Sequence, residues 1–362
     1  MKRLWLLLLL LCLLLPAGSM AEGVLDLSGQ SFESVEAIAQ AIDAAEPAAS
    51  VNLGSMELTW AQRKELMAQY PQVHFIWTVN IFGVSVSSED KDIDLDGVKK
   101  LGKISELCEA LDCLPKAENV YMWKHGLQRN DKITLHERFP DIFFGWDIRL
   151  NESHRLRTDA TSFSTLGKQP LLSKQHMVNI TFCPNLKALD VGHCLIQDIS
   201  FLEDCAKLKV LILADAGIKD LSPLACQTEV EYLELFLNDI KDISPLANMT
   251  KLRDVNLAFN EITDLSPLYN LPNLERVWLM QNEGLKQEEV DRLQLHQPDC
   301  EIVTYSWGAT GNRMKKERGQ LIQFPGTSWR DHPHYDTIYY IFNGGEYIDW
   351  DDPIPENWQK KK

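Results

Sequence analysis

The sequence predicts an α/β solenoid whose strands form a parallel sheet, with helix-containing turns in its N-terminal half and a cap at its C-terminal end. Three observations predict this fold class. A strict 22-residue repeat runs through residues 186–273, a longer strand–helix–strand pattern recurs before it, and a repeat-free aromatic segment follows it. One repeat of this length cannot bury its apolar side alone, so stacked repeats must share a core.

Residues 1–21 have the composition of a signal peptide. Lys2 and Arg3 precede a twelve-residue apolar run, and a stretch of small residues then ends at Ala21. The apolar run is too short to span a bilayer. We therefore expect these residues to be removed and the remaining chain to be secreted or held at the cell surface.

Residues 22–185 contain the longer pattern. A strand at Val51, and again at Val120, leads through a helical stretch to a proline twenty residues later and a second strand. A third copy begins at Val277, inside the fifth 22-residue unit. We interpret the first two copies as divergent solenoid turns that extend or cap the repeats. The alternative is a separate α/β cap packed on the first repeat.

The 22-residue units share the pattern L-x-x-L-x-L-x-x-N-x-I-x-D-[IL]-S-P-L. They begin, in order, at Leu186, Leu208, Val230, Leu252 and Leu274. Apolar residues two apart, such as Leu233 and Leu235, are typical of a half-buried strand, and equivalent strands of successive units would pair in parallel.

Two polar residue types recur at fixed places in the unit. Asparagine recurs where the chain leaves the strand, at Asn238, Asn260 and Asn282. Its side-chain amide can bond backbone groups that the bend leaves without partners. Cys194 and Ala216 replace it in the first two units, so we expect those turns to be less well satisfied, unless Cys194 serves as a weak donor. Aspartate recurs before each S-P-L turn, or its counterpart in the first unit, at Asp198, Asp220, Asp242 and Asp264. Its carboxylate can accept hydrogen bonds from the backbone amides of the turn. We interpret both sets as structural, with no metal and no cofactor.

The repeat pattern resembles the leucine-rich repeat, and its D-[IL]-S-P-L half is similar to the internalin-type subclass. A run from Trp329 to Ile338 resembles the tail of exported leucine-rich repeat proteins of anaerobic Gram-positive bacteria. The resemblance implies a leucine-rich repeat horseshoe with a concave parallel sheet over residues 186–305. It also implies non-catalytic recognition of an extracellular or surface protein by a bacterial protein.

The segment 306–362 is rich in aromatic residues and has no repeat. We expect it to cap the open end of the solenoid, since exposed solenoid ends require covering. The alternative is that this segment folds back over the concave sheet.

The sequence offers little chemistry for catalysis. It lacks H-E-x-x-H, G-x-S-x-G and Walker-type motifs. A formal charge of −16 disfavours nucleic-acid binding. Cys183 and Cys205 occupy one column on neighbouring turns, and we expect buried free thiols there rather than a disulfide.

The candidate site lies on strand positions that point away from the core. We expect binding residues there at Tyr232, Glu234, Phe236, Leu237, Asp254, Phe259 and Trp278. The four aromatic residues would be exposed anchors, because large exposed apolar patches mark binding sites. Glu234 and Asp254 would orient a partner whose rim is positively charged.

Two other functions are compatible with these residues. Aromatic platforms beside carboxylates also bind glycans, so a cell-envelope protein that binds or processes glycans is the second hypothesis. Glu234 and Asp254 lie on neighbouring repeats, too close together for an inverting catalytic pair. A structural spacer without a ligand is the third, and it leaves the aromatic residues unexplained.

Overall fold

The computed structural model describes residues 23–166, 171–304, 314–317, 320–323, 333–343 and 347–358. The predicted signal peptide lies outside these residues, and so do the first four residues of the run from Trp329 to Ile338. The chain forms two compact units, Met1–Trp146 and Asp147–Lys362.

The first unit contains two small sheets with helices between their strands. The first sheet and its helices are β1 (Val24–Asp26), α2 (Val35–Ala44), β2 (Ser50–Gly54), α3 (Trp60–Gln69), β3 (His74–Ile81) and β4 (Val84–Ser87). The second comprises β5 (Asp92–Asp94), α4 (Ile104–Leu111), β6 (Asn119–Tyr121), α5 (Arg129–Arg138) and β7 (Phe143–Gly145). All neighbouring strands are parallel except β3 and β4, which form a hairpin.

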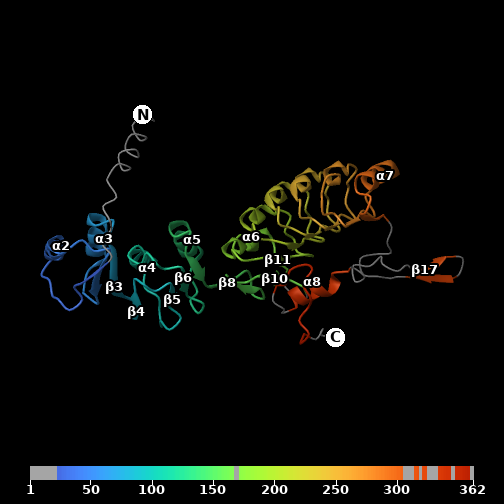
Figure 1. Cartoon of the computed structure of the whole chain (residues 1–362). Coiled ribbons are helices and arrows are strands. Elements are labelled where there is room, and N and C mark those ends of the chain that lie inside the picture. Colours follow the sequence, from blue (N-terminus) through green and yellow to red (C-terminus); the bar gives the residue numbers. More distant parts are fainter. Residues whose placement is uncertain are drawn as a thin grey trace, which may run out of the picture. The chain divides into compact units, whose positions relative to one another are not determined.

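Both strand–helix–strand copies expected in this region are present, as β2–α3–β3 and β6–α5–β7 (Figure 1). The sequence determines where α3 begins. The Thr59 hydroxyl accepts from the backbone N–H of Gln62, and the Gln62 side chain accepts from the backbone N–H of Thr59. This reciprocal capping box satisfies two amides that the first helical turn leaves without partners.

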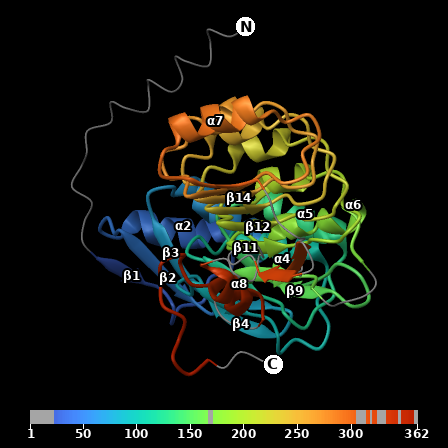
Figure 2. The same cartoon turned by 90° about the vertical axis from the view of Figure 1, so that its right-hand side faces the viewer.

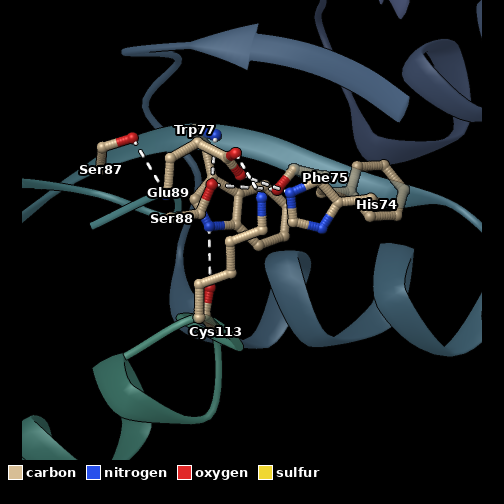
Figure 3. Close-up of polar contacts among 8 residues, drawn as sticks. His74, Phe75, Trp77, Ser87, Ser88, Glu89 and Cys113 are labelled. Atoms are coloured by element: carbon tan, nitrogen blue, oxygen red, sulfur yellow. Dashed lines mark hydrogen bonds and ion pairs between the residues drawn. The ribbon is translucent and has the colours of Figure 1, made fainter. Parts of the chain in front are cut away.

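Trp77 fixes the core of the first unit. Its indole N–H donates to the carbonyl oxygen of Cys113 over 2.9 Å, and its backbone N–H donates to Ser88 Oγ over 3.1 Å (Figure 3). The Ser88 hydroxyl in turn donates to the carbonyl of Phe75. Trp77 is 1% exposed, so these hydrogen bonds satisfy polar groups that burial would otherwise strand.

The second unit is a solenoid built on a seven-stranded parallel sheet (Figure 1). Its strands are β10 (Ser162–Ser164), β11 (Ala188–Asp190), β12 (Val210–Ile212), β13 (Tyr232–Glu234), β14 (Asp254–Asn256), β15 (Arg276–Trp278) and β16 (Glu301–Val303). An antiparallel hairpin of β8 (Asp147–Arg149) and β9 (Arg155–Arg157) precedes them. The sheet thus begins before Leu186, because buried Phe163 of β10 takes the place that leucine holds in later strands.

The third strand–helix–strand copy closes this sheet as β15, α7 (Gln287–His296) and β16. The other turns use short helices: α6 (Lys174–Met177), η1 (Ile180–Phe182), η2 (Ser200–Asp204), η3 (Ser222–Cys226), η4 (Ser244–Asn248) and η5 (Ser266–Leu268). Neighbouring η helices stack on one another along one side of the sheet (Figures 1 and 2).

The predicted asparagine column is confirmed as a structural device. Asn260 Nδ2 donates to the carbonyls of Leu235 and Leu257, and its Oδ1 accepts from the backbone N–H of Ile240. Asn238 and Asn282 make the equivalent contacts. These side chains replace the backbone partners that the chain loses when it turns off each strand.

The two units without asparagine are satisfied differently. Cys194 Sγ donates weakly to Thr165 Oγ1 over 3.6 Å, as predicted. The backbone N–H of Ala216 donates to Asn238 of the next repeat.

The aspartate column is also confirmed. Each carboxylate accepts from the backbone N–H two residues on, over 2.8–2.9 Å, at Asp198, Asp220, Asp242 and Asp264. Hydrogen bonds from Lys174 and the Ser200 amide lower the pKa of Asp198 to about 2. Each aspartate therefore holds the turn that starts an η helix.

The C-terminal part of the second unit has a separate hairpin and helix. The hairpin pairs β17 (Met314–Glu317) with β18 (Gln320–Gln323), and the helix is α8 (Tyr335–Phe342). Figures 1 and 2 show α8 beside β10 and β11, and these elements are in contact. The C-terminal segment therefore reaches the side of the sheet that the η helices leave free.

Candidate functional site

The candidate site is the side of the seven-stranded sheet that points away from the η helices, here called the sheet face. Because strand side chains alternate, Leu211, Leu233 and Val255 point into the solenoid core and are fully buried. Their neighbours in each strand, such as Val210 and Tyr232, point to the sheet face. The register of the parallel strands places Val210, Tyr232 and Asp254 side by side.

The C-terminal segment covers part of the sheet face. Ile338, Tyr340 and Ile341 of α8 pack with Trp350 in one apolar cluster. On the sheet side, this cluster contains Ala188, Val210 and Tyr232. A cap over the open end of the last repeat was expected, but α8 and Trp350 lie over β10 to β13, as in the alternative in which the tail folds back over the sheet.

Tyr232 is consequently not an exposed anchor. Its ring stacks on that of Trp350, with ring centroids 5.5 Å apart, and only 2% of the residue is exposed. The ring of His334 lies on Trp350 as well, with centroids 4.1 Å apart. Tyr232, which was expected to contact a partner, therefore contacts Trp350 of the same chain.

Basic side chains that the sequence analysis did not select hold the covering segment. Lys209 Nζ lies 2.6 Å from Asp349, and Arg253 Nη1 lies 2.8 Å from Asp351. The ammonium groups of Lys187 and Lys209 lie 5.0 and 6.0 Å from the ring centroid of Tyr347. The signal was available in the repeat pattern, because Lys187, Lys209 and Arg253 each follow the first leucine of their unit.

Glu234 is buried rather than displayed on a rim. Its oxygens accept from the hydroxyl of Tyr232, from Asn256 Nδ2 and from the backbone N–H of Phe236, over 2.9–3.2 Å. Burial raises the pKa of Glu234 to about 8, although these hydrogen bonds favour the charged form. The expectation that Glu234 steers a charged partner is therefore not met, since its carboxyl group is turned toward the protein.

Asp254 is also buried, with 5% of the residue exposed. Arg276 Nε lies 4.0 Å from its carboxylate, and Arg276 also pairs with Glu301. Neither acidic residue chosen from the sequence is a rim charge. The predicted preference for a positively charged partner accordingly loses its basis at these two positions.

A second apolar cluster lies farther along the sheet face. Trp278, Met280, Ala258 and Val303 are buried in it, and the half-buried rings of Phe236 and Phe259 pack against them. The two phenylalanine rings meet edge to face, with centroids 5.0 Å apart. Three of the predicted aromatic residues are thus brought together here, but Trp278 is 3% exposed and is not the exposed anchor that was expected. Leu237 beside them is 43% exposed.

Two residues of this region have an unusual backbone conformation. Leu237 has φ 56° and Phe259 has φ 58°, and both belong to a column of left-handed residues with His193, Asp215 and Gln281. Glycine and asparagine adopt this conformation most easily, whereas large side chains disfavour it by about 1–2 kcal/mol. The left-handed conformation recurs at the same position of each repeat. Folding of the repeat therefore does not require large apolar side chains at Leu237 and Phe259.

The described ranges contain no cluster of three or more His, Cys, Asp or Glu residues placed to hold a metal ion. All cysteines described there are free, which confirms the prediction for Cys183 and Cys205. Burial raises the pKa of Cys205 to about 12, so this thiol is unreactive. None of the described helices has the length and apolarity required of a membrane span.

The first unit has surface cavities of its own. The larger, about 570 Å³, lies where β2 and β3 end, and its lining includes Trp60, Thr78 and Asn80. The smaller, about 320 Å³, is lined by Tyr70, His74 and other residues. His74 pairs with Glu89 (Figure 3). Lys116 pairs with the same carboxyl group, so the polar groups beside this cavity already have partners.

Comparisons with known proteins address the repeats. Residues 228–270 match the family model described as Leucine Rich repeats (2 copies). No curated protein matches the chain.

Several solved structures are similar to it. Internalin C2 of Listeria monocytogenes is 25% identical, with a TM-score of 0.33 over 54% of this chain and 74% of that one. An internalin, inlF, of the same organism is 20% identical, with a TM-score of 0.35 over 75% of this chain and 74% of that one. A leucine-rich repeat protein of Leptospira interrogans is 14% identical, with a TM-score of 0.27, and the match covers 71% of this chain and 65% of that one.

The family match agrees with the geometry described above. The matched residues include β13 and β14, the asparagines at 238 and 260, and the S-P-L turns that start η4 and η5. Residues 228–270 therefore match the leucine-rich repeat model in sequence and have the regular strand and turn pattern of a repeat.

Proposed function

We propose that this chain is a non-catalytic, extracellular or surface-exposed binding protein that recognises another protein through its sheet face. The contact surface is the part of that face beyond the C-terminal cover, with Phe236, Leu237 and Phe259 as contact residues and Trp278 supporting them from below. Leucine-rich repeats commonly serve as binding scaffolds, which supports a role in protein binding.

One observation carries the proposal. Leu237 and Phe259 are large apolar residues held in the left-handed conformation, and Leu237 is 43% exposed. Their backbone position would suit asparagine or glycine better, and an exposed leucine gains little from burial. Residues that disfavour folding where they stand are expected at functional surfaces.

The polar groups on this face support binding rather than glycan processing. Glu234 directs its oxygens to Tyr232, Asn256 and the Phe236 amide, so it does not face a substrate. A glycosidase needs two carboxyl groups on opposite sides of a scissile bond. The hypothesis of glycan processing therefore finds no specific support on the sheet face.

The test compares two leucine substitutions. Wild type, Leu237→Asn and Leu195→Asn are immobilised and exposed to extracellular and envelope proteins under identical conditions. Leu195 is the matched control, because it is 68% exposed and lies outside the apolar clusters of the sheet face. We expect a protein retained by wild type and by Leu195→Asn to be lost from Leu237→Asn.

Thermal unfolding of the same three proteins separates binding from folding. Asparagine tolerates the left-handed conformation, so Leu237→Asn is expected to be as stable as wild type, or more stable by about 1 kcal/mol. Retention of the same partner by all three proteins would place the binding surface elsewhere.

A further inference from the structure

The C-terminal segment that lies on the sheet face has an ordered chemical pattern. Asp349 pairs with Lys209, Trp350 stacks on Tyr232, and Asp351 pairs with Arg253. The three partners come from three successive repeats. Residues 349–351 therefore form an acid–aromatic–acid segment that crosses neighbouring strands and contacts one repeat with each residue.

The spacing of the repeats suits a short turn. Adjacent parallel strands lie about 4.8 Å apart, so two repeats separate Lys209 from Arg253 by roughly 10 Å. Residues 349–352 form a turn that is closed by the backbone N–H of Asp352, which donates to the carbonyl of Asp349 over 3.0 Å. The turn sets Trp350 against Tyr232, and the long side chains of Lys209 and Arg253 reach its two aspartates.

The charges of this part of the face complement the segment. The chain as a whole carries a formal charge of −16, yet the covered repeats offer Lys187, Lys209 and Arg253 along one edge. The Lys209 ammonium and the Arg253 guanidinium hold the pKa values of Asp349 and Asp351 below their usual range. The face thus favours negatively charged side chains on either side of an aromatic ring.

The two parts of the cover are held differently. In α8, Ile338 and Ile341 are each 1% exposed, so this helix belongs to the core of the unit. By contrast, the side chains of Asp349 and Asp351 are 57% and 75% exposed. Exposed ion pairs hold a segment weakly, and Trp350 is its single deep anchor.

The sheet does not depend on the aspartates to neutralise its cations. Lys209 also lies 3.5 Å from Glu231, and Arg253 lies 2.8 Å from Glu275. Each basic residue therefore keeps an acidic neighbour on the next repeat if the segment leaves. Departure of residues 349–351 exposes an aromatic surface without stranding a buried charge.

We propose that this part of the sheet face is a binding site for an acid–aromatic–acid turn of a partner protein, and that residues 349–351 occupy the site until such a turn displaces them. The inference rests on the proposed protein-binding function and names the chemistry of the partner. It adds a second contact region beside Phe236, Leu237 and Phe259.

The experiment uses a labelled synthetic peptide with the sequence of residues 347–354, YIDWDDPI, and the full chain. In wild type, the tethered segment competes at an effective concentration of about millimolar, so the added peptide binds weakly. We expect the full-chain variant Asp349→Asn/Trp350→Ala/Asp351→Asn to bind the peptide at least tenfold more tightly. Adding Lys209→Glu and Arg253→Glu to that variant should abolish binding.

Two controls make the result specific. Asp352→Asn removes a neighbouring charge that forms none of these ion pairs, and it should bind the peptide as wild type does. A peptide in which alanine replaces the tryptophan should not bind any of the proteins. Equal affinity of the tail variant and wild type, or binding that survives the Lys209 and Arg253 reversals, would overturn the proposal.

A measurement on unaltered protein covers the case in which the tail variant does not fold. Hydrogen exchange of wild type is followed with and without excess peptide. Displacement predicts faster exchange in residues 347–352 and unchanged exchange in α8, and no change in either would contradict it. If Leu237→Asn keeps its partner while the peptide still displaces the tail, the proposed contact surface fails and this site stands.

Discussion

Single side chains decide whether each repeat of the solenoid is satisfied. The asparagine at the end of each strand forms hydrogen bonds with three or more backbone groups of its own repeat and its neighbours. Burial of those groups without a partner costs about 1–3 kcal/mol each. The asparagine column therefore contributes to stability through backbone groups rather than through apolar area.

Replacing Asn260 with alanine tests this account. The change strands the amide of Ile240 and removes one of the two asparagine donors from each of the carbonyls of Leu235 and Leu257, so we expect a loss of roughly 1–3 kcal/mol in urea unfolding. Asn273→Ala is the matched control, because its side chain donates one exposed hydrogen bond to Thr250. Similar losses for both variants would show that the buried contacts have no special weight.

The carboxyl group of Glu234 makes the stability of the second unit depend on pH. Its pKa is about 8 in the folded protein against an ordinary value of 4.5, so the folded state binds more protons between these values. The free energy of unfolding should consequently fall as pH rises from about 5 to 8, by at most ~1.4 kcal/mol per pH unit.

The variant Glu234→Gln isolates this effect, because glutamine does not titrate and has nearly the same shape. Urea unfolding of both proteins at several pH values gives the difference between them. We expect wild type to lose stability relative to the variant as pH rises toward 8. A difference that stays constant across this range would contradict the raised pKa.

At the level of elements, α8 and the segment after it contribute unequally. Ile338 of α8 is 1% exposed, whereas Ile354 packs only partly against the same cluster. We expect Ile338→Ala to cost about 2–4 kcal/mol and Ile354→Ala to cost about 1 kcal/mol or less. Urea unfolding followed by tryptophan fluorescence measures both, and equal losses would show that the two parts form one inseparable cap.

Elements that depend on the repeat period could be predicted from the sequence. Leu233 and Leu235, the asparagines and the turn aspartates recur every 22 residues, so their roles follow from one geometry. The cover over Tyr232 could not be predicted in the same way. Its contact with Trp350 joins residues 118 positions apart, and the C-terminal segment has no period that fixes where it docks. Alternation places a side chain on a face but does not show what covers that face.

At the scale of the molecule, the chain consists of two units that each have their own core, Met1–Trp146 and Asp147–Lys362. In the first, Leu66 of α3 is fully buried. In the second, Leu233 is fully buried inside the solenoid. A unit with its own buried core is able to unfold as its own cooperative transition.

This organisation predicts two calorimetric transitions with separate sensitivities. Leu66→Ala removes buried methyl groups from the first unit, and Leu233→Ala does the same in the second. Each should lower the stability of its own unit by about 3–5 kcal/mol, because the cavity left behind adds to the lost transfer free energy. We expect each variant to shift one transition in differential scanning calorimetry and to leave the other within a degree or so of wild type. A single transition that both substitutions shift alike would mean that the two units unfold together, and the peptide experiment would then report on the whole chain rather than on the repeats alone.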